Sequence, residues 1–177
     1  MQQPPQLLAE LAHFLRSRLS SDLQAIPPAA RDWRPVPDSN TINLIVRHLR
    51  IEAEWHLHCL EDGRPMPTVA VHLDQETIDS VPVDFDLNLR ALNDLFARFC
   101  TLLETSSLDL LHSRTVTAYK GSSRPVPPHL LAYHQLVHIA AHLGQISTLH
   151  NLYRKAHGER GLFPDNPSYP RSSASPE

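Results

Sequence analysis

Residues 133–151, YHQLVHIAAHLGQISTLHN, contain the pattern that decides the predicted fold. On a helix, side chains four residues apart are neighbours on one face, with Cβ atoms about 5–6 Å apart. His134, His138 and His142 therefore form one stripe, which Gln145 continues. The stripe also holds three leucines, Leu131, Leu149 and Leu152. We therefore expect it to be the core face of a long helix.

Three imidazoles and an amide on an aliphatic stripe require partners, because an unsatisfied buried polar group costs about 1–3 kcal/mol. A metal ion satisfies several imidazoles at once, and histidine is its commonest side-chain ligand. The rest of the chain is then expected to form a scaffold that supplies at least one further ligand.

Helical periodicity recurs in three other segments. Leucines at 7, 8, 11, 15, 19 and 23 predict a helix over 5–24, which ends before the prolines at 27 and 28. A second helix is expected over 41–62, capped by Asp38, Ser39 or Asn40, and a third over 84–105. The stripe at 133–151 belongs to a fourth helix over 128–156, which ends near Gly158.

The connections between these helices are rich in proline. Residues 26–40 should form an ordered loop that Trp33 packs onto the bundle, and short extended pieces are expected at 69–73 and 115–119. The pattern predicts an all-α four-helix bundle with long inter-helix connections over residues 1–157, whose topology need not alternate simply up and down. Residues 158–177 are rich in Pro and Ser and should form a partly disordered tail.

Composition excludes several classes of function. The chain has 177 residues, which suggests one domain, and a formal net charge of −3 favours neither nucleic acid nor an anionic membrane as a partner. No apolar run approaches the roughly 20 residues that span a bilayer, and the first residues do not resemble a signal peptide. The two cysteines, Cys59 and Cys100, form no CxxC motif, so we expect a reducing, cytoplasmic setting.

Histidine is the compositional outlier, with 12 residues in the chain. A catalytic zinc-type site commonly has three protein ligands, two of which one helix can supply at positions i and i+4. His138 and His142 are the expected pair, and His48, on a face of the second helix with Leu44 and Cys59, is the expected third ligand.

Three neighbours of this set are candidates for supporting roles. His134 could replace His142, act as a fourth ligand or lie behind the ligands, while Glu52 and Gln145 could orient a ligand or hold a water. Glu52 could also be a plain solvated or salt-bridged residue. A lone histidine on an apolar face is more often an inert, hydrogen-bonded residue, which is the interpretation preferred for His56 and His58.

Two segments in this order resemble the DinB-like superfamily of four-helix metalloproteins: NTINLIVRHL at Asn40–Leu49 and HIAAHLGQI at His138–Ile146. The resemblance implies metal ligands at His48, His138 and His142, a divalent metal such as zinc or nickel, and frequent homodimerisation. The superfamily often has Arg or His before the Gly-Gln pair, whereas this chain has Leu143.

The resemblance also implies the activities to consider. Some relatives are transferases or isomerases that use a low-molecular-weight thiol such as mycothiol or bacillithiol, and others are metal-dependent hydrolases. The first hypothesis is therefore a thiol-dependent transferase acting on a small electrophile, with the metal lowering the thiol pKa. The alternatives are a hydrolase that uses metal-bound water, with Glu52 as its base, and a non-catalytic metal- or ligand-binding bundle. Cys59 is expected to be a small buried hydrophobe.

Overall fold

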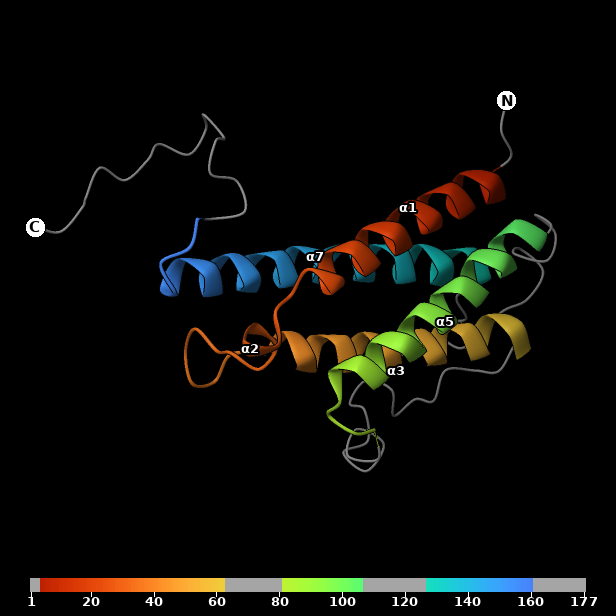
Figure 1. Ribbon diagram of the computed structural model, residues 1–177. Coiled ribbons are helices and arrows are strands. Elements are labelled where there is room, and N and C mark those ends of the chain that lie inside the picture. Colours follow the sequence, from red (N-terminus) through yellow and green to blue (C-terminus); the bar gives the residue numbers. More distant parts are fainter. Residues whose placement is uncertain (1–3, 63–80, 107–126, 161–177) are drawn as a thin grey trace, which may run out of the picture.

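The computed structural model describes residues 4–62, 81–106 and 127–160. In these ranges the chain forms four long helices, α1 (Pro4–Gln24), α3 (Ile42–Asp62), α5 (Phe85–Thr105) and α7 (Pro128–Ala156), together with the single turn α2 (Pro28–Arg31) (Figure 1). The all-helical prediction is confirmed, and the four bounds agree closely with those expected. The extended pieces expected at 69–73 and 115–119, and the tail from residue 161, lie outside the described residues.

The four long helices form a closed ring of neighbours: α1 contacts α5, α5 contacts α3, α3 contacts α7, and α7 contacts α1. Side-chain pairs give the directions. Arg50 with Asn88, and Glu61 with Arg98, align α3 parallel to α5. Helix α1 runs antiparallel to α5, and His13 pairs with Glu104 between them (Figure 1). The bundle therefore does not alternate simply up and down, because the sequential helices α3 and α5 run the same way (Figure 1).

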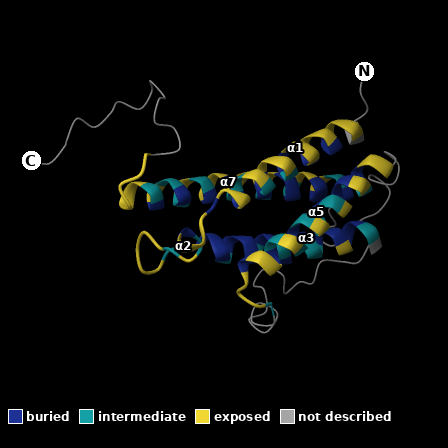
Figure 2. Cartoon of the chain, viewed as in Figure 1, coloured by how far each residue is buried: buried dark blue, intermediate teal, exposed yellow. Residues whose placement is uncertain are grey.

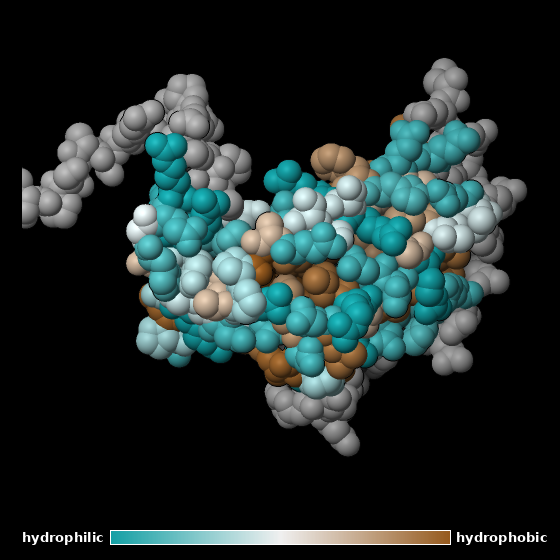
Figure 3. Space-filling view, in the orientation of Figure 1, coloured by the Kyte–Doolittle hydropathy of each residue, from teal (hydrophilic) through white to brown (hydrophobic). Residues whose placement is uncertain are grey.

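The core lies along the axis of this ring, where the buried faces of all four helices meet (Figure 2). Fully buried side chains come from every long helix: Leu19, Leu23, Leu49, Leu57, Leu92, Phe96, Leu103, Leu136, Ile139 and Ile146. Each such side chain stabilises the fold by about 1.5–3 kcal/mol relative to exposure. The outer surface in Figure 3 is mostly hydrophilic, with apolar side chains visible between the helices.

Local signals explain where the helices begin and end. Thr41, rather than the expected Asp38, Ser39 or Asn40, caps α3, because its Oγ1 accepts a hydrogen bond from the Leu44 amide at 3.1 Å. Asp84 caps α5 in the same way, through the Leu87 amide at 2.8 Å. Gly158 follows α7 with a φ of 74°, the left-handed conformation that ends a helix and that glycine adopts without strain.

The segment between α1 and α3 is ordered as expected, with the turn α2 inside it. Trp33 packs edge-on against Tyr153, with ring centroids 5.8 Å apart, and thereby holds this segment to the end of α7. None of the helices in the described ranges is long and apolar enough to cross a membrane.

The histidine stripe of α7 lies beside the core rather than at its centre, which corrects the sequence prediction. The fully buried line of α7 passes through Gln135, Leu136, Ile139 and Ile146, whereas Leu152 is 41% exposed. The physical reason is that α7 packs against two helices, α1 and α3, so its buried face points between them. The histidines occupy the edge of that face that contacts α3.

Candidate metal centre

The candidate site lies at the contact between α3 and α7. The two helices run antiparallel, because His48 meets His138 while His56, two turns further along α3, meets His134 one turn earlier in α7. This arrangement brings His48 of α3 opposite His138 and His142 of α7, which are four residues apart. Within the described ranges, His48, His138 and His142 form the one group of three His, Cys, Asp or Glu residues that could hold a metal ion.

The three imidazoles converge through their Nε2 atoms. The Nε2 of His138 lies 3.0 Å from that of His48 and 3.0 Å from that of His142. All three ligand atoms lie within 4.8 Å of one another. The rings meet edge to face, with interplanar angles of 74°, 68° and 89°. All three side chains are partly buried.

Hydrogen bonding alone does not satisfy this cluster. A neutral imidazole nitrogen carries either one hydrogen or one lone pair, so it makes one good hydrogen bond. The Nε2 of His138 has two neighbours at 3.0 Å and can pair well with only one of them. A cation among the three atoms would instead accept a lone pair from each nitrogen.

The charge state of the cluster also suits a cation. Burial, with repulsion from neighbouring histidines second, lowers the pKa of His48 to about 4 and that of His138 to about 3. Burial likewise lowers the pKa of His142. The three imidazoles are therefore neutral at pH 7, which is the protonation state that metal ligation requires.

Gln145 contacts the cluster through His142. Its Oε1 accepts a hydrogen bond from His142 Nδ1 at 2.8 Å, so the ring hydrogen resides on Nδ1 and the lone pair of Nε2 faces the other histidines. A hydrogen bond to the distal nitrogen is the usual way to fix a metal-binding imidazole. His138 lacks this support from the described part of the chain, where its buried Nδ1 has no hydrogen-bond partner.

His134 lies next to the cluster but is not part of it. Its ring stacks on His138 with centroids 5.8 Å apart, and its Nδ1 lies 3.0 Å from Nε2 of His56. His56 is completely buried, and its Nδ1 donates to the Glu52 carbonyl oxygen at 2.7 Å. The Nε2 of His56 is therefore the acceptor, and His134 donates to it.

Glu52 is buried, at 3% exposure, so its interpretation as a solvated residue is wrong. Its Oε2 lies 3.8 Å from Nδ1 of His56. Glu52 does not belong to the group of ligand atoms within 4.8 Å that the three histidines form. The carboxylate therefore lies beside His56 and is not one of the converging ligand atoms.

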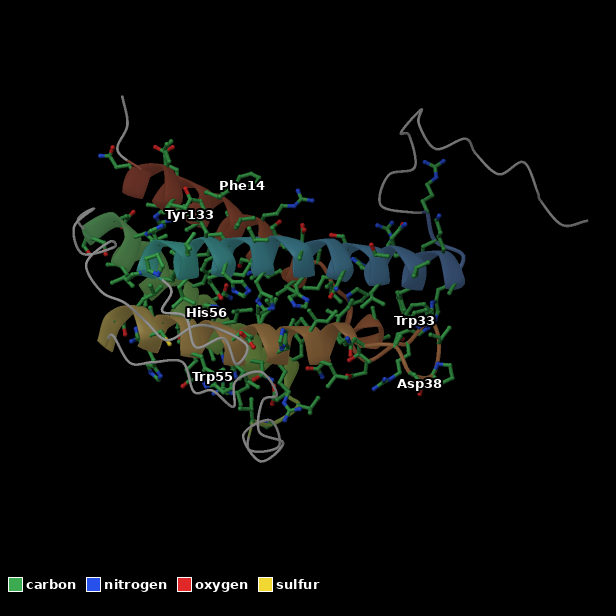
Figure 4. All side chains as sticks on the ribbon, turned by 180° about the vertical axis from the view of Figure 1, so that it is seen from behind. Phe14, Trp33, Asp38, Trp55, His56 and Tyr133 are labelled. Carbon is green, nitrogen blue, oxygen red and sulfur yellow. The ribbon has the colours of Figure 1, made fainter. Side chains whose placement is uncertain are left out.

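His56 is buried and hydrogen-bonded, as expected for an inert histidine, but its contact with His134 beside the centre was not predicted from the sequence. The α7-facing side of α3 centres near Glu52, between His48 and His56. Figure 4 shows His56 in the space between α3 and α7. The signal was available: His48, Glu52 and His56 recur every four residues, the same spacing as His134, His138 and His142.

The donor set fits a divalent metal ion. Two bonds of 2.0–2.1 Å at the tetrahedral angle would separate two nitrogens by roughly 3.3 Å. The closest pairs here lie at 3.0 Å, so small side-chain movements suffice to accommodate an ion. Three neutral imidazoles suit zinc, nickel and related borderline metals. The two cysteines play no part: both are buried, and burial raises the pKa of each thiol, to about 11 for Cys59.

Fold and cluster together define the class of protein: a helical bundle with three converging histidines between two antiparallel helices. Comparison with known families is consistent with this class, since the model of the DinB superfamily matches residues 11–146. The chain therefore belongs to the DinB superfamily. Searches of curated proteins and of solved structures gave no match. Leu143, where relatives often carry Arg or His, is buried and faces the core, so the chain supplies no cation to the site from this position.

Proposed function

We propose that this protein is a metal-dependent enzyme, and most specifically a transferase that joins a low-molecular-weight thiol to a small electrophile. The convergence of three Nε2 atoms at the α3–α7 contact is the observation that carries the proposal. Membership of a superfamily whose members often bind metals agrees with it.

The residues at the α3–α7 contact would have different roles in this reaction. His48, His138 and His142 would hold zinc or nickel, and Gln145 holds the His142 ring in the orientation that ligation needs. A bound ion would lower the pKa of a thiol at its remaining position, so that the thiol loses its proton to solvent and reacts as a thiolate. The sulfur then bonds to an electrophilic carbon, and the leaving group departs with the electron pair of the bond that breaks. Neither cysteine of the chain enters this reaction.

A specific observation favours the transferase over the hydrolase. A hydrolase would need a general base to take the proton of the attacking water. Glu52 is the candidate base, but its Oε2 lies 3.8 Å from His56 Nδ1, and among the described residues no carboxylate oxygen belongs to the group of converging ligand atoms. A thiol that is already ionised needs no such base.

Metal content tests the first half of the proposal. The untagged wild-type protein should contain about one zinc or nickel ion per chain by mass spectrometry. His138→Ala should lose it, while the control His58→Ala, at an exposed position of α3, should keep it. Equal metal content in both variants would overturn the site.

Thiol dependence tests the second half. Turnover of activated aryl halides and epoxides should rise to saturation with an added thiol, tested with both N-acetylcysteinamide and N-acetylcysteine, and should vanish in His138→Ala. Turnover that needs no thiol would support the hydrolase instead. A protein that holds metal but produces no thiol-dependent product would be the non-catalytic bundle.

We also propose that the protein forms a homodimer. The N-terminal halves of α1 and α7 expose apolar side chains, among them Phe14 at 65% and Val137 at 66%. Phe14 and Tyr133 lie near the same end of the two neighbouring helices (Figure 4). Light scattering should show a dimer for the wild type and a monomer for the double variant Phe14→Glu, Val137→Glu. A wild-type monomer would contradict the proposal.

A further inference from the structure

An open groove of about 540 Å³ lies where the start of α3 meets the C-terminal half of α7. This volume falls within the roughly 300–1,000 Å³ of sites that bind small molecules. On the α3 side it is lined by Ser39, Asn40 and Ile45. On the α7 side it is lined chiefly by Gly144, Gln145 and Thr148.

The groove adjoins the metal centre through one side chain. Gln145 lines the groove, and its Oε1 is 2.8 Å from Nδ1 of His142, whose Nε2 points into the three-histidine cluster. The amide nitrogen of Gln145 keeps two hydrogens, which a ligand in the groove could accept. A molecule in the groove would thus touch the residue that orients a metal ligand.

Most of the lining area is apolar, and the polar side chains that the described residues add to it carry no charge. The Ser39 hydroxyl donates to the Val36 carbonyl at 2.9 Å, and the Thr148 hydroxyl donates to the Gly144 carbonyl at 2.8 Å. Both hydroxyl oxygens therefore present lone pairs, while the Gln145 amide presents hydrogens. Among the described residues, no Arg, Lys, His, Asp or Glu lines this groove.

A second cavity shows the opposite chemistry. It has a volume of about 470 Å³ and lies at the C-terminal ends of α1 and α7, where Arg18, Asp22, Arg154 and Glu159 line it. There the cations pair with the carboxylates, Arg18 with Asp22 at 3.0 Å and Arg154 with Glu159 at 3.3 Å. The lack of charge in the first groove is thus a property of that groove and not of cavities in this chain generally.

Building on the proposed function, we propose that the uncharged groove binds the hydroxyl- or amide-bearing part of the thiol cosubstrate. Amide and hydroxyl groups can both donate to the groove oxygens and accept from the Gln145 amide. A carboxylate would find no cation there and would lose part of its hydration. The proposal therefore specifies a neutral thiol and excludes an acidic one.

Gly144 provides a direct means of testing the groove. A Cβ built at this position meets no atom within 4 Å, so a side chain there would project into open space. Gly144→Leu should fold and occupy the groove, and Gly144→Ala is the matched control that changes the backbone preference but fills little volume. Ala141→Leu, at an exposed position of the same wall, is a second blocking variant.

The experiment uses two thiols of nearly the same shape, N-acetylcysteinamide and N-acetylcysteine, which differ by one carboxylate. The thiolate-to-cobalt absorption band measures the binding of each thiol to the cobalt-loaded protein. The wild type and Gly144→Ala should prefer the amide, and blocking variants should reduce this preference by about tenfold. The measured quantity is the ratio of the two dissociation constants. Comparing this ratio between proteins cancels the effect of the different acidities of the two thiols. Cobalt content should be the same in every protein.

The outcomes separate the two proposals. If the ratio of the affinities for the two thiols is the same in the wild type and in both blocking variants, the groove assignment is overturned while the thiol function stays intact. A preference of the wild type for N-acetylcysteine would also overturn it. No absorption band with either thiol, in a protein that holds cobalt, would refute the thiol function itself and this proposal with it.

Discussion

Replacing His56 by alanine tests the packing of α3 against α7, because this residue has no place in the metal centre yet is completely buried. Its imidazole makes two hydrogen bonds, to the Glu52 carbonyl at 2.7 Å and to His134 at 3.0 Å. Its ring also stacks on His134 with centroids 5.2 Å apart.

The magnitude follows from these contacts. Truncating a fully buried large side chain to alanine typically costs about 2–5 kcal/mol, including the cavity that remains. The two lost hydrogen bonds account for about 1 kcal/mol each of that cost and place it in the upper part of the range. The Glu52 carbonyl keeps its helical partner, but His134 Nδ1 loses its acceptor. We expect a loss of about 3–5 kcal/mol in the free energy of unfolding, a large share of the roughly 5–15 kcal/mol of a typical protein.

Urea denaturation of the metal-free protein at pH 7.5 measures this loss. At that pH the His56 imidazole is neutral in the folded state, where burial lowers its pKa to about 4, and largely neutral in the unfolded chain. Proton binding therefore adds little to the difference. His58→Ala, at an exposed position two residues away, is the control and should change the free energy by less than about 0.5 kcal/mol.

The same variants separate packing from metal binding. His56→Ala leaves His48, His138 and His142 in place, so the folded variant should retain its metal. Free energies of unfolding within 0.5 kcal/mol of each other for His56→Ala and His58→Ala would refute the packing described here. Full loss of metal from a folded His56→Ala protein would show that His56 takes part in the centre.

Three further predictions concern the neighbourhood of the centre. Gly144→Ala should raise the free energy of unfolding by about 0.5–1 kcal/mol, because glycine is unfavourable inside a helix and the new Cβ meets no atom within 4 Å; an unchanged or lower urea midpoint would contradict this. Gln145→Leu removes the acceptor of His142 Nδ1 and should weaken metal affinity by about 10–100-fold in a competition titration with a chelator; an unchanged affinity would show that the hydrogen bond does not orient the ligand. The metal-free protein should lose stability as the pH falls from 6.5 towards 4, because the unfolded histidines take up protons there while His48, His56 and His138, with pKa values lowered to about 4, 4 and 3, do not; a flat urea midpoint across that range would count against their burial.

Much of this molecule was predictable from the pattern of residues along each helix. The bounds of α1, α3, α5 and α7 follow from apolar periodicity, proline positions and a terminal glycine, which are local properties of the chain. The choice of His48, His138 and His142 needed periodicity together with the two superfamily segments. The structure brings these three side chains together, and the contact of Gln145 with His142 follows from their spacing on one helix.

Other features depended on how the helices pack. Periodicity gives the angular order of side chains around one helix, but it does not determine the rotation of that helix against its neighbours or the axial register between them. For α7, contact with both α1 and α3 turned the fully buried line towards Ile139 and left the histidines at its edge. For α3, the rotation against α7 buried both Glu52 and His56 and paired His56 with His134, which the periodicity of one helix does not reveal.

Sequence alone therefore determined the four long helices, the all-α fold class and the three residues of the candidate centre. The tertiary structure decided which polar side chains became buried beside that centre and where an uncharged groove opened next to it. The physical reason is that helical periodicity arises within one segment. Burial, cavities and the pairing of His56 with His134 arise only when side chains from segments far apart in the chain fill the same space.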